Sequence, residues 1–376
     1  MITAIDMIGT SLASGTKSYN LYFSKYLMNK NLSDKVYIIT CLDYSKLIDL
    51  KNKNIKVLIK SNILKNSLIK FLWMQFILPF ELKFLNVKQF YSPMNYGPLT
   101  LKLFNIKFVL ALHSNLPWVY FFMMPGNILR NLLTKYFMQL SILFCDKLIV
   151  DSYYAKKEIQ NYISIEDNKI EVVYLGINDE DEVSNGELNP VFLNNKNYFL
   201  SVLSCVKYHN IINLLKAYRI LIDKFDHKIN YILVMQVLDK SYFNEIKKFI
   251  EKNFKKKEII IYSNLDYKYL KELYKNSKFY LFSSYCEVFG LTSLEAMANN
   301  CPVLTSNRSA LKEINLDAAK YFDPDNIEEI VEMMNELLKN KHLIKELKEK
   351  GLKHSKKFSW DKTVDYTLKI LDLEFK

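Results

Sequence analysis

The stretch over residues 283–297 carries residue types that suit an anion held beside hydroxyl groups. It follows an apolar run and contains Glu287 and Gly290 ahead of a helical pattern that begins at Leu291. Gly290 permits close backbone approach to a ligand, and the unpaired amides of a helix start attract phosphate. Glu295 lies in the first turns of the same helix. Because two carboxylates repel a phosphate, we expect them to bind sugar and ribose hydroxyls. The alternative is that Glu287 only caps the helix and that Glu295 is solvated.

Short apolar runs alternate with amphipathic segments along the chain, and the elements they form must position that stretch. In the first half, strands are predicted at Ile2–Met7, Val36–Thr40, Ile55–Ile59, Lys88–Tyr91, Phe108–Leu112, Lys147–Val150 and Ile170–Tyr174, and helices at Thr16–Asn29, Leu64–Leu78, Ile128–Cys145 and Tyr153–Tyr162. In the second half, strands are predicted at Tyr198–Leu203, Asn230–Met235, Glu258–Tyr262, Phe279–Phe282, Pro302–Thr305 and Ala319–Phe322, and helices at Ile211–Lys224, Tyr242–Asn253, Tyr267–Asn276 and Leu291–Asn299. Three further helices are predicted at Asn326–Lys339, Lys341–Lys356 and Trp360–Leu373. The pattern predicts an α/β fold of two Rossmann-like, doubly wound domains that face each other across a cleft.

Length and composition agree with two globular domains. The chain has 376 residues, half of them hydrophobic and 24% charged, which suits two domains of roughly 150–200 residues and argues against disorder. The segment 179–197 is acidic and contains Gly186 and Pro190, so we interpret it as a linker. The domains are therefore predicted at 1–178 and 198–356, with a final helical segment at 357–376.

The positive charge is concentrated in the first half. Residues 1–178 contain 21 lysines and arginines against 11 acidic residues, whereas residues 179–376 contain 31 against 29. A basic half attracts nucleic acid, acidic lipid headgroups or a phosphorylated acceptor. The alternative is a lysine-rich solvated surface. No recognised nucleic-acid-binding motif accompanies the charge, so we expect no nucleic-acid partner.

The cysteines and the apolar segments constrain the cellular setting. The five cysteines form no CxxC pair and have no metal-spaced histidine, so we expect free thiols in a reducing compartment and no metal site. Met1–Ile8 is too short for a signal peptide, and no apolar run reaches the ~18 residues of a membrane span. We therefore expect a cytoplasmic protein.

Several motifs in the second half resemble those of one enzyme family. E-V-F-G-L-T-S-L-E-A-M-A, which holds Glu287 and Glu295, resembles the E-x7-E motif of retaining GT-B glycosyltransferases, especially family 4. Further stretches resemble family patterns in the same order: N-N-C-P-V-L-T-S-N at 299–307, A-L-K-E-I at 310–314 and A-K-Y-F-D-P at 319–324. In the first half, D-K-L-I-V-D-S at 146–152 is similar to the family's D-x-(V/I)-I-x-x-S, and K-I-E-V-V-Y-L-G-I-N at 169–178 to its K-I-x-V-I-x-N-G-V-D. The resemblance covers nearly the whole chain and is weakest over residues 30–105.

The resemblance implies roles for individual positions. It assigns Glu287 to the hydroxyls of the donor sugar and Glu295 to the ribose. The backbone amides that would bind the diphosphate and sugar are those of Phe289, Gly290, Leu291 and Thr292. His113 follows a predicted strand and resembles the family's histidine beside the reacting carbon, although a lone histidine is more often a hydrogen-bonded structural residue. The loop 9–16 resembles the family's glycine loop, which would place Gly15 and Thr16 nearest the donor phosphate.

One departure concerns the cations that neutralise the diphosphate. The family usually places an Arg and a Lys about five residues apart after the first strand of its second domain. Here the stretch is S-V-L-S-C-V-K-Y-H-N and contains no Arg. We therefore interpret Lys207 as the main phosphate cation and His209, at the family's Lys position, as its helper. Asn300, where the family often has Gly, is a milder departure.

The resemblance also implies the reaction and the partners. It predicts a hexosyltransferase that moves a sugar from a UDP- or GDP-sugar to a glycan or lipid-linked acceptor with retention of configuration, without a metal or other cofactor. The N-terminal domain would bind the acceptor, the C-terminal domain the nucleotide sugar, and the last helix would pack back on the N-terminal domain. Bacterial-type lipopolysaccharide, O-antigen or capsule synthesis is the expected setting.

Two apolar stretches suggest where the acceptor or a membrane would bind. F-L-W-M-Q-F-I-L-P-F at 71–80 has lysines nearby, and P-W-V-Y-F-F-M-M-P at 117–125 follows His113. We favour a core position for the first stretch and acceptor or membrane contact for the second, with peripheral attachment to an anionic inner membrane face as the hypothesis. The alternative functions are a catalytically weak nucleotide-sugar-binding subunit and a GT-B sugar-nucleotide epimerase.

Overall fold

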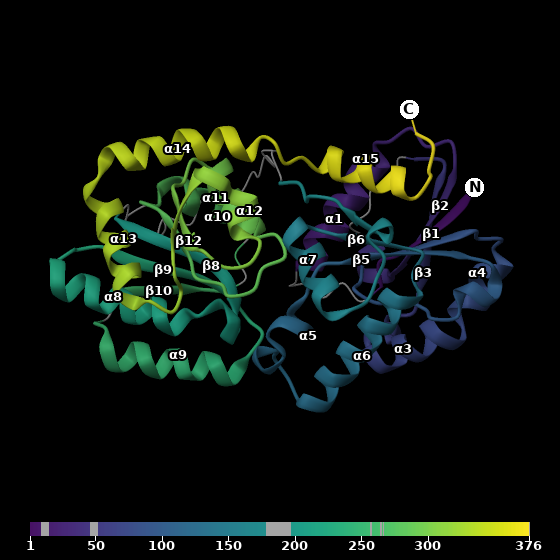
Figure 1. Cartoon of the computed structure of the whole chain (residues 1–376), viewed down its shortest axis with the longest axis horizontal. Coiled ribbons are helices and arrows are strands. Elements are labelled where there is room, and N and C mark those ends of the chain that lie inside the picture. The colour runs from purple at the N-terminus through teal and green to yellow at the C-terminus, as the bar shows by residue number, and fades with distance from the viewer. Residues whose placement is uncertain are drawn as a thin grey trace. The chain divides into compact units, whose positions relative to one another are not determined.

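The computed structural model describes residues 1–8, 15–45, 52–177, 197–255, 258–263, 265 and 267–375, and only the backbone of residues 15–18, 43 and 44. The chain forms two compact units. The first contains Met1–Trp118, Leu129–Gly176 and Ser359–Lys376, and the second contains Val119–Ile128 and Ile177–Phe358. Figure 1 labels their helices and strands. Of the predicted linker over 179–197, only Asn197 belongs to the described residues.

The first unit is built on a parallel sheet of seven strands in the order β3-β2-β1-β4-β5-β6-β7. Its strands are β1 (Ile2–Asp6), β2 (Lys35–Cys41), β3 (Ile55–Lys60), β4 (Gln89–Ser92), β5 (Lys107–Leu112), β6 (Lys147–Val150) and β7 (Ile170–Val172). Nearly all residues of β1, β4, β5 and β6 are buried, because helices cover both faces of a parallel sheet. The strand order reverses between β1 and β4, which is the usual ligand-binding position of a doubly wound sheet.

The helices around this sheet include one from the end of the chain. They are α1 (Gly15–Met28), α2 (Leu42–Ser45), α3 (Ser67–Phe76), α4 (Leu78–Phe84), α5 (Leu116–Val119), α6 (Ile128–Phe144), α7 (Tyr153–Tyr162) and α15 (Trp360–Ile370). Helix α15 packs beside α1, as Figure 1 shows. The buried Trp360 ring lies 5.7 Å from Tyr19 and 5.4 Å from Tyr22. The last helix thus completes the unit that holds the start of the chain.

The second unit is built on a parallel sheet of six strands in the order β10-β9-β8-β11-β12-β13. Its strands are β8 (Tyr198–Cys205), β9 (Asn230–Val237), β10 (Ile259–Tyr262), β11 (Tyr280–Phe282), β12 (Val303–Ser306) and β13 (Ala319–Phe322). The order reverses between β8 and β11. An aromatic cluster fills the core, where the Phe199 ring lies 4.4 Å from Tyr231 and 5.1 Å from Phe279. The predicted pair of Rossmann-like parallel α/β folds is confirmed.

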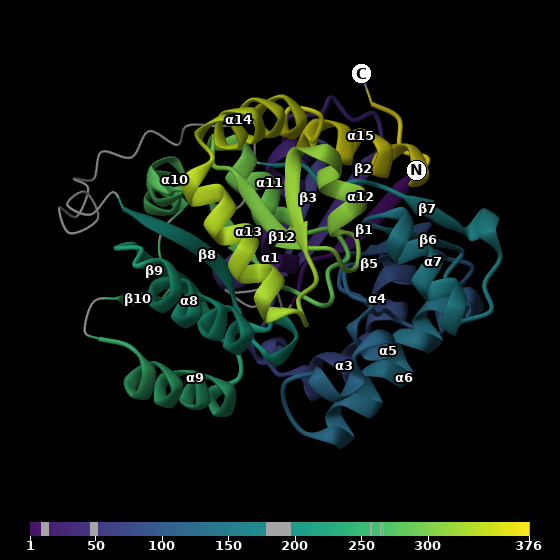
Figure 2. The ribbon, with the colours of Figure 1, turned by 60° about the vertical axis from the view of Figure 1, so that its left-hand side comes forward.

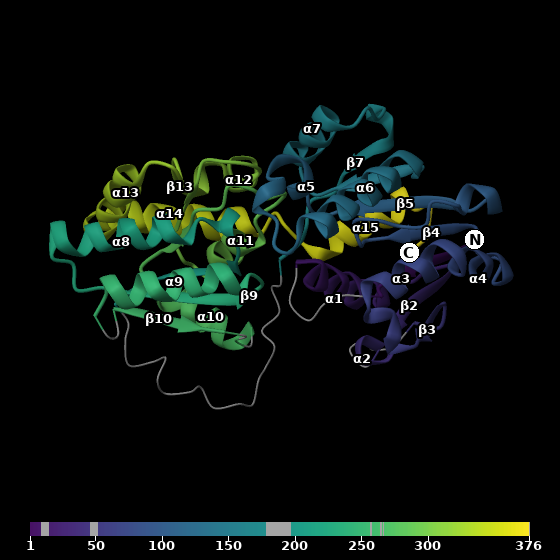
Figure 3. The same ribbon diagram turned by 90° about the horizontal axis from the view of Figure 1, so that it is seen from below.

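Helices cover both faces of this second sheet. They are α8 (Ile211–Phe225), α9 (Lys240–Asn253), α10 (Tyr267–Asn276), α11 (Leu291–Ala298), α12 (Leu311–Asn315), α13 (Ile327–Lys339) and α14 (Lys341–Ser355). Figure 2 shows α8, α9 and α13 on one face and α10, α11 and α14 on the other, in agreement with the packing of α8 on α13 and of α11 on α14. Figure 3 shows α8 and α9 side by side.

One predicted helix is divided in the structure. Leu64–Leu78 was expected to be continuous, but a 3-10 turn spans Asn62–Lys65, α3 ends at Phe76 and α4 begins at Leu78. Pro79 lies in the first turn of α4, where its missing N–H costs no hydrogen bond. Within the described residues, no helix is both long and apolar enough to cross a membrane.

Candidate functional site

The two strands that flank the switch point of the second sheet each contribute one side chain to a polar cluster. After β8, a 3-10 turn over Lys207–His209 precedes α8, and after β11 a loop leads through Glu287 to α11. Both loops leave the carboxyl edge of the sheet, because all strands are parallel. His209 Nε2 lies 3.2 Å from Glu287 Oε1. The predicted site residues His209 and Glu287 are thus in direct contact.

The other nitrogen of His209 determines where the protons lie. His209 Nδ1 is 2.6 Å from the Ser204 carbonyl oxygen, which only accepts hydrogen bonds, so Nδ1 carries a proton. The contact between Nε2 and the Glu287 carboxylate then requires a second proton between these two atoms. The side chains of His209 and Glu287 are 9% and 20% exposed. The pair therefore holds one shared proton at the edge of the sheet.

Glu295 projects from α11 into a site rich in tyrosine hydroxyls. Burial raises the pKa of its carboxyl to about 7, and a hydrogen bond from the Tyr274 hydroxyl, 3.4 Å away, opposes this shift. Burial also raises the pKa of Tyr280 well above its usual value, and the charges of Glu295 and Glu287 add to the increase. Both carboxylates therefore act on one buried hydroxyl, which itself donates to Thr292 Oγ1 over 2.8 Å.

Gly290 forms the corner between the loop and α11. Its backbone is left-handed, with φ of +93°, and a Cβ there would lie 2.6 Å from Leu311 Cδ2. Gly290 is the N-cap of α11 and has no side chain with which to cap the helix. The amides of Leu291 and Thr292 in the first turn are therefore available to an anion, which the helix dipole also favours.

The remaining residues predicted for the second unit differ in exposure. Lys207 is exposed, whereas His209 is buried. The Phe289 side chain is buried, with its ring 5.8 Å from Phe358. Only the backbone of Phe289 is therefore suited to a ligand, and the Thr292 hydroxyl is already bound to Tyr280.

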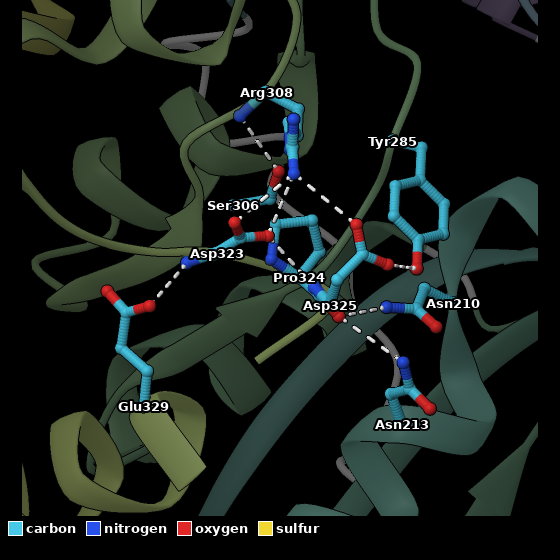
Figure 4. Close-up of polar contacts among 9 residues, drawn as sticks. All are labelled: Asn210, Asn213, Tyr285, Ser306, Arg308, Asp323, Pro324, Asp325 and Glu329. Carbon is cyan, nitrogen blue, oxygen red and sulfur yellow. Dashed lines mark hydrogen bonds and ion pairs between the residues drawn. The ribbon is translucent and has the colours of Figure 1, made fainter. Parts of the chain in front are cut away.

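A second polar network ties the neighbouring loops together, as Figure 4 shows. The Arg308 guanidinium donates to Asp323 over 3.0 Å and lies 3.3 Å from Asp325. Asp325 also accepts from the Tyr285 hydroxyl. The Asp325 N–H and then the Arg308 charge hold the pKa of Asp323 below its usual value. The network links the loop that carries Glu287 to the loops after β12 and β13.

Further hydrogen bonds extend these links to the segment after β8. The side-chain amides of Asn210 and Asn213 donate to the Pro324 carbonyl over 2.7 and 3.3 Å, as Figure 4 also shows. The Glu287 N–H donates to Ser309 Oγ over 3.0 Å, and the Glu287 carbonyl accepts from Ala310. Ser309 and Ala310, in the loop after β12, thus hold the Glu287 backbone in place.

In the first unit, His113 lies at the carboxyl end of β5 and contacts a residue that we did not predict. His113 Nδ1 is 3.0 Å from both carboxylate oxygens of Asp151, which follows β6. The ring also lies 4.3 Å from the Tyr19 ring. Asp151 could have been found from the sequence, because it ends the strand next to the one that His113 follows.

The loop after β1 is only partly described. Residues 9–14 lie outside the described part, and of Gly15 and Thr16 the structure gives the backbone at the start of α1. At the end of β1, the buried Lys70 ammonium donates to the Ile8 carbonyl and lies 3.0 Å from Asp6 Oδ2. This buried ion pair was also missing from the sequence analysis, because Lys70 lies on α3 at a distance in the chain.

Other features of the described residues do not belong to these clusters. No group of three or more His, Cys, Asp or Glu side chains among them could hold a metal ion. A cavity of about 360 Å³ in the first unit is lined by Lys107 and Lys147, the first residues of β5 and β6. It lies at the amino ends of these strands, opposite to His113.

Sequence models of two glycosyltransferase families match consecutive parts of the chain. The model described as Glycosyltransferase Family 4 matches residues 14–181, and the model described as Glycosyl transferases group 1 matches residues 189–354. The first match falls on the sheet that positions His113, and the second on the sheet that positions Glu287 and Glu295.

Relatives and solved structures that resemble the chain are also glycosyltransferases or share their fold. O-antigen chain mannosyltransferase RfbU of Salmonella typhimurium is 24% identical over 217 residues, which are 58% of this chain and 57% of RfbU. The uncharacterized glycosyltransferase MJ1178 of Methanocaldococcus jannaschii is 26% identical over 71% of this chain and 69% of its own. The structure of Anabaena Alr3699/HepE in complex with UDP and glucose superimposes with a TM-score of 0.73 at 14% identity, covering 99% of both chains, which shows a common fold. With both halves matched in the order that this fold requires, the chain belongs to the GT-B glycosyltransferases of family 4.

Proposed function

We propose that the chain transfers a hexosyl residue from a nucleoside diphosphate sugar to a glycan or lipid-linked acceptor, with retention, in the synthesis of a surface polysaccharide such as O-antigen, lipopolysaccharide or capsule. The observation that carries this proposal is the corner at Gly290. There, the first amides of α11 follow Gly290, with Glu287 three residues before this glycine and Glu295 five residues after it in the chain. The O-antigen role of RfbU supports the choice of acceptor class.

In this proposal, different residues of the second unit bind different parts of the donor. Glu287 binds hydroxyls of the sugar, Glu295 binds the ribose, and the amides from Phe289 to Thr292 bind the diphosphate. Lys207, which is exposed, supplies the mobile cation for the leaving group. His209 instead pairs with Glu287, so its charge reaches the diphosphate only through that pair.

In the first unit, His113 binds a sugar hydroxyl, and Gly15 and Thr16 extend the phosphate site. In the reaction, the bond between the anomeric carbon and the diphosphate oxygen breaks. The acceptor hydroxyl oxygen bonds to the same face of that carbon, and its proton passes to the departing diphosphate. No protein nucleophile and no metal or other cofactor takes part, since the helix amides and Lys207 stabilise the leaving charge.

The test is a panel of UDP-, GDP- and ADP-sugars, with release of the nucleoside diphosphate as the signal. A mannose donor comes first, because RfbU is a mannosyltransferase. We expect one donor to be turned over, and Glu287→Gln to lower kcat by at least about 100-fold. The matched control is Glu328→Gln, in the first turn of α13. Donor binding without turnover would instead identify a binding subunit, and conversion of the donor sugar to an epimer would identify an epimerase.

We also propose that the first unit binds an anionic bilayer. The stretch over residues 71–80 is only partly core. Its buried apolar residues are Trp73, Met74, Leu78 and Pro79, and its exposed ones are Leu72, Phe76, Ile77 and Phe80. Exposed apolar side chains on α3, α4 and α6 include Leu68, Leu72, Phe76, Phe80, Phe84, Leu129, Leu132, Leu133 and Tyr136. Helices α3 and α6 are in contact, with the Phe71 and Phe137 rings 4.2 Å apart. An apolar face on a basic half of the chain matches the chemistry of an acidic membrane surface.

Flotation with vesicles of phosphatidylcholine and phosphatidylglycerol tests this proposal. We expect binding that falls with added salt and with the double substitution Phe76→Ser/Phe84→Ser. The control, Ile220→Ser/Leu352→Ser, removes exposed apolar side chains from the second unit. The proposal is contradicted if both double variants float equally, or if the bound fraction does not change with salt concentration.

A further inference from the structure

His113 and Asp151 form a buried pair at the carboxyl edge of the first sheet. β5 and β6 are in register up to Leu112 and Val150, so the next residue of each strand lies at the same level. His113 Nδ1 is 3.0 Å from both oxygens of Asp151. The two side chains are 7% and 1% exposed, so dissolved ions screen their interaction little.

The carboxylate determines which ring nitrogen carries the proton. An ionised carboxylate only accepts hydrogen bonds, so His113 Nδ1 donates, and Nε2 of the neutral ring is then an acceptor. Helix α7 begins directly after Asp151, with Ser152 as its N-cap, and its dipole favours the negative charge. Within the described part of the chain, His113 is the only hydrogen-bonding partner of Asp151.

The ring of His113 is also held on its other sides. Its backbone N–H donates to Asn95 Oδ1 over 2.6 Å, and the Tyr19 ring lies against the imidazole. The Tyr19 hydroxyl is 2.6 Å from that of Tyr91. Burial raises the pKa of both tyrosines, so they remain neutral. Among the described residues, Asp151 is the carboxylate in contact with this ring.

The second ring nitrogen of His113, Nε2, is available to accept a hydrogen bond from a ligand. His113 Nε2 is buried and has no hydrogen-bond partner among the described residues. A buried acceptor without a partner is unfavourable, and such atoms in native proteins usually have a reason. Asp151 occupies a position that the pattern D-x-(V/I)-I-x-x-S leaves open.

We infer that Asp151 is a positioning residue that fixes the Nδ1–H tautomer of His113 and turns Nε2 toward a sugar hydroxyl, which donates to it. The inference rests on the proposed glycosyl transfer for its substrate. The hydroxyl belongs either to the donor sugar or to the acceptor. Without the carboxylate, the ring is free to present an N–H at Nε2, and the hydrogen bond to the substrate reverses.

The structural part of the inference can be tested without activity. The chain has five histidines, so ¹⁵N-histidine spectra can be assigned with single His→Asn substitutions. We expect His113 Nε2 to show the shift of an unprotonated nitrogen at pH 8, and Asp151→Asn to move that shift toward a protonated one. Asp167→Asn, at an exposed carboxylate, should leave it unchanged. A protonated Nε2 in the wild-type protein at pH 8 overturns the inference.

The kinetic part uses the donor found in the panel. We expect Asp151→Asn to lower kcat/KM by about tenfold or more, and Asp151→Glu to recover part of the loss. The effect of Asp151→Asn should vanish in a His113→Asn background, because Asp151 acts through the ring. An equal loss in both backgrounds means a structural role and overturns the inference.

The substrate arms complete the test. A loss in donor hydrolysis assigns the hydroxyl to the donor, and a loss in transfer alone assigns it to the acceptor. If no donor is turned over, the proposed function fails while the spectra still decide the tautomer.

Discussion

The carboxyl of Glu295 titrates near neutral pH, so the proposed contact between Glu295 and the ribose should make nucleotide binding sensitive to pH. Burial raises the pKa of its carboxyl to about 7. Ribose hydroxyls that donate to the carboxylate favour the ionised form and lower that pKa. We therefore predict that nucleoside diphosphate binding releases a fraction of a proton near pH 7, and almost none at pH 5 or pH 9.

Calorimetry in buffers of different ionisation enthalpy measures this release. Glu295→Gln should remove it, because the amide does not titrate, and should weaken binding about tenfold. Glu336→Gln, on α13, serves as a control. The same release from the Glu295→Gln variant would show that the proton comes from another group.

The pair of His209 and Glu287 makes a separate prediction about kcat. His209 Nε2 lies 3.2 Å from Glu287 Oε1, and this contact holds the carboxylate in one position. His209→Gln replaces the ring with a shorter amide, which still donates hydrogen bonds but does not reproduce the geometry of the ring. We expect the variant to lose a few-fold in kcat. His227→Gln, which alters a histidine bound to Asn335, should keep the wild-type kcat, and an unchanged kcat in His209→Gln would contradict the role of the pair.

Single residues could be selected from the sequence where their proposed role depends on a local motif. Glu287, Gly290 and Glu295 lie within one short stretch, so their spacing along a corner and a helix was enough to select them. The partners His209 and Asp151 depend on which strands are neighbours in the sheets. The sequence suggested His209 as a phosphate ligand from its place in a pattern, but its contact with Glu287 follows from the β8–β11 neighbourhood.

At the scale of elements, buried parallel strands made the fold predictable. Apolar runs such as β6 (Lys147–Val150) and β13 (Ala319–Phe322) have the predicted bounds, because strands covered on both faces have few polar positions. The helix predicted over Leu64–Leu78 has the wrong ends, because α3 spans only Ser67–Phe76. The apolar periodicity continues across the break before Pro79, but the helical backbone does not. Apolar periodicity indicates which face of a helix is buried, but it does not indicate where the helix begins or ends.

The corner between the Glu287 loop and α11 depends on Gly290, so we predict the effect of substituting this glycine. The left-handed φ disfavours any other residue, and a Cβ would meet Leu311 Cδ2 at 2.6 Å. Gly290→Ala should therefore shift the first amides of α11 and reduce kcat/KM at least tenfold, with a smaller change in thermal stability. The control is Ser309→Ala, which removes only the hydroxyl that accepts from the Glu287 N–H and should cost less. Full activity of Gly290→Ala would exclude these amides from the phosphate site.

At the scale of the molecule, the last segment of the chain belongs to the first unit, although the residues before it form the second unit. Ser359–Lys376 belongs to the same compact unit as the N-terminus, and Thr363 Oγ1 donates to the Tyr174 carbonyl over 2.8 Å. Sequence patterns gave the last helix but no contact between it and the Gly176 region, since such a pairing is set by tertiary packing. The integrity of the first unit, with its His113 site, therefore depends on the last residues of the chain.

Substitution of Gly176 tests whether the last segment packs on the first unit. A Cβ there would lie 2.1 Å from the Trp360 backbone nitrogen and 2.5 Å from the Ser359 carbonyl carbon, and backbone atoms cannot move aside as a side chain can. We predict that Gly176→Ala lowers the stability of the first unit by about 1–3 kcal/mol, or about 2–4 °C in Tm per kcal/mol. All three tryptophans, Trp73, Trp118 and Trp360, lie in that unit, so their fluorescence reports its unfolding alone.

The matched substitution for this experiment is Gly351→Ala in the second unit. A Cβ at Gly351 would lie 3.1 Å from Met297 Cγ, which belongs to a flexible side chain, and alanine favours the helix by up to about 1 kcal/mol. Gly351→Ala should therefore leave the tryptophan-detected Tm unchanged, while Gly176→Ala lowers it. If Gly176→Ala leaves that Tm unchanged, then Ser359–Lys376 is not packed against the region of Gly176, because no packed arrangement there has room for the added methyl group.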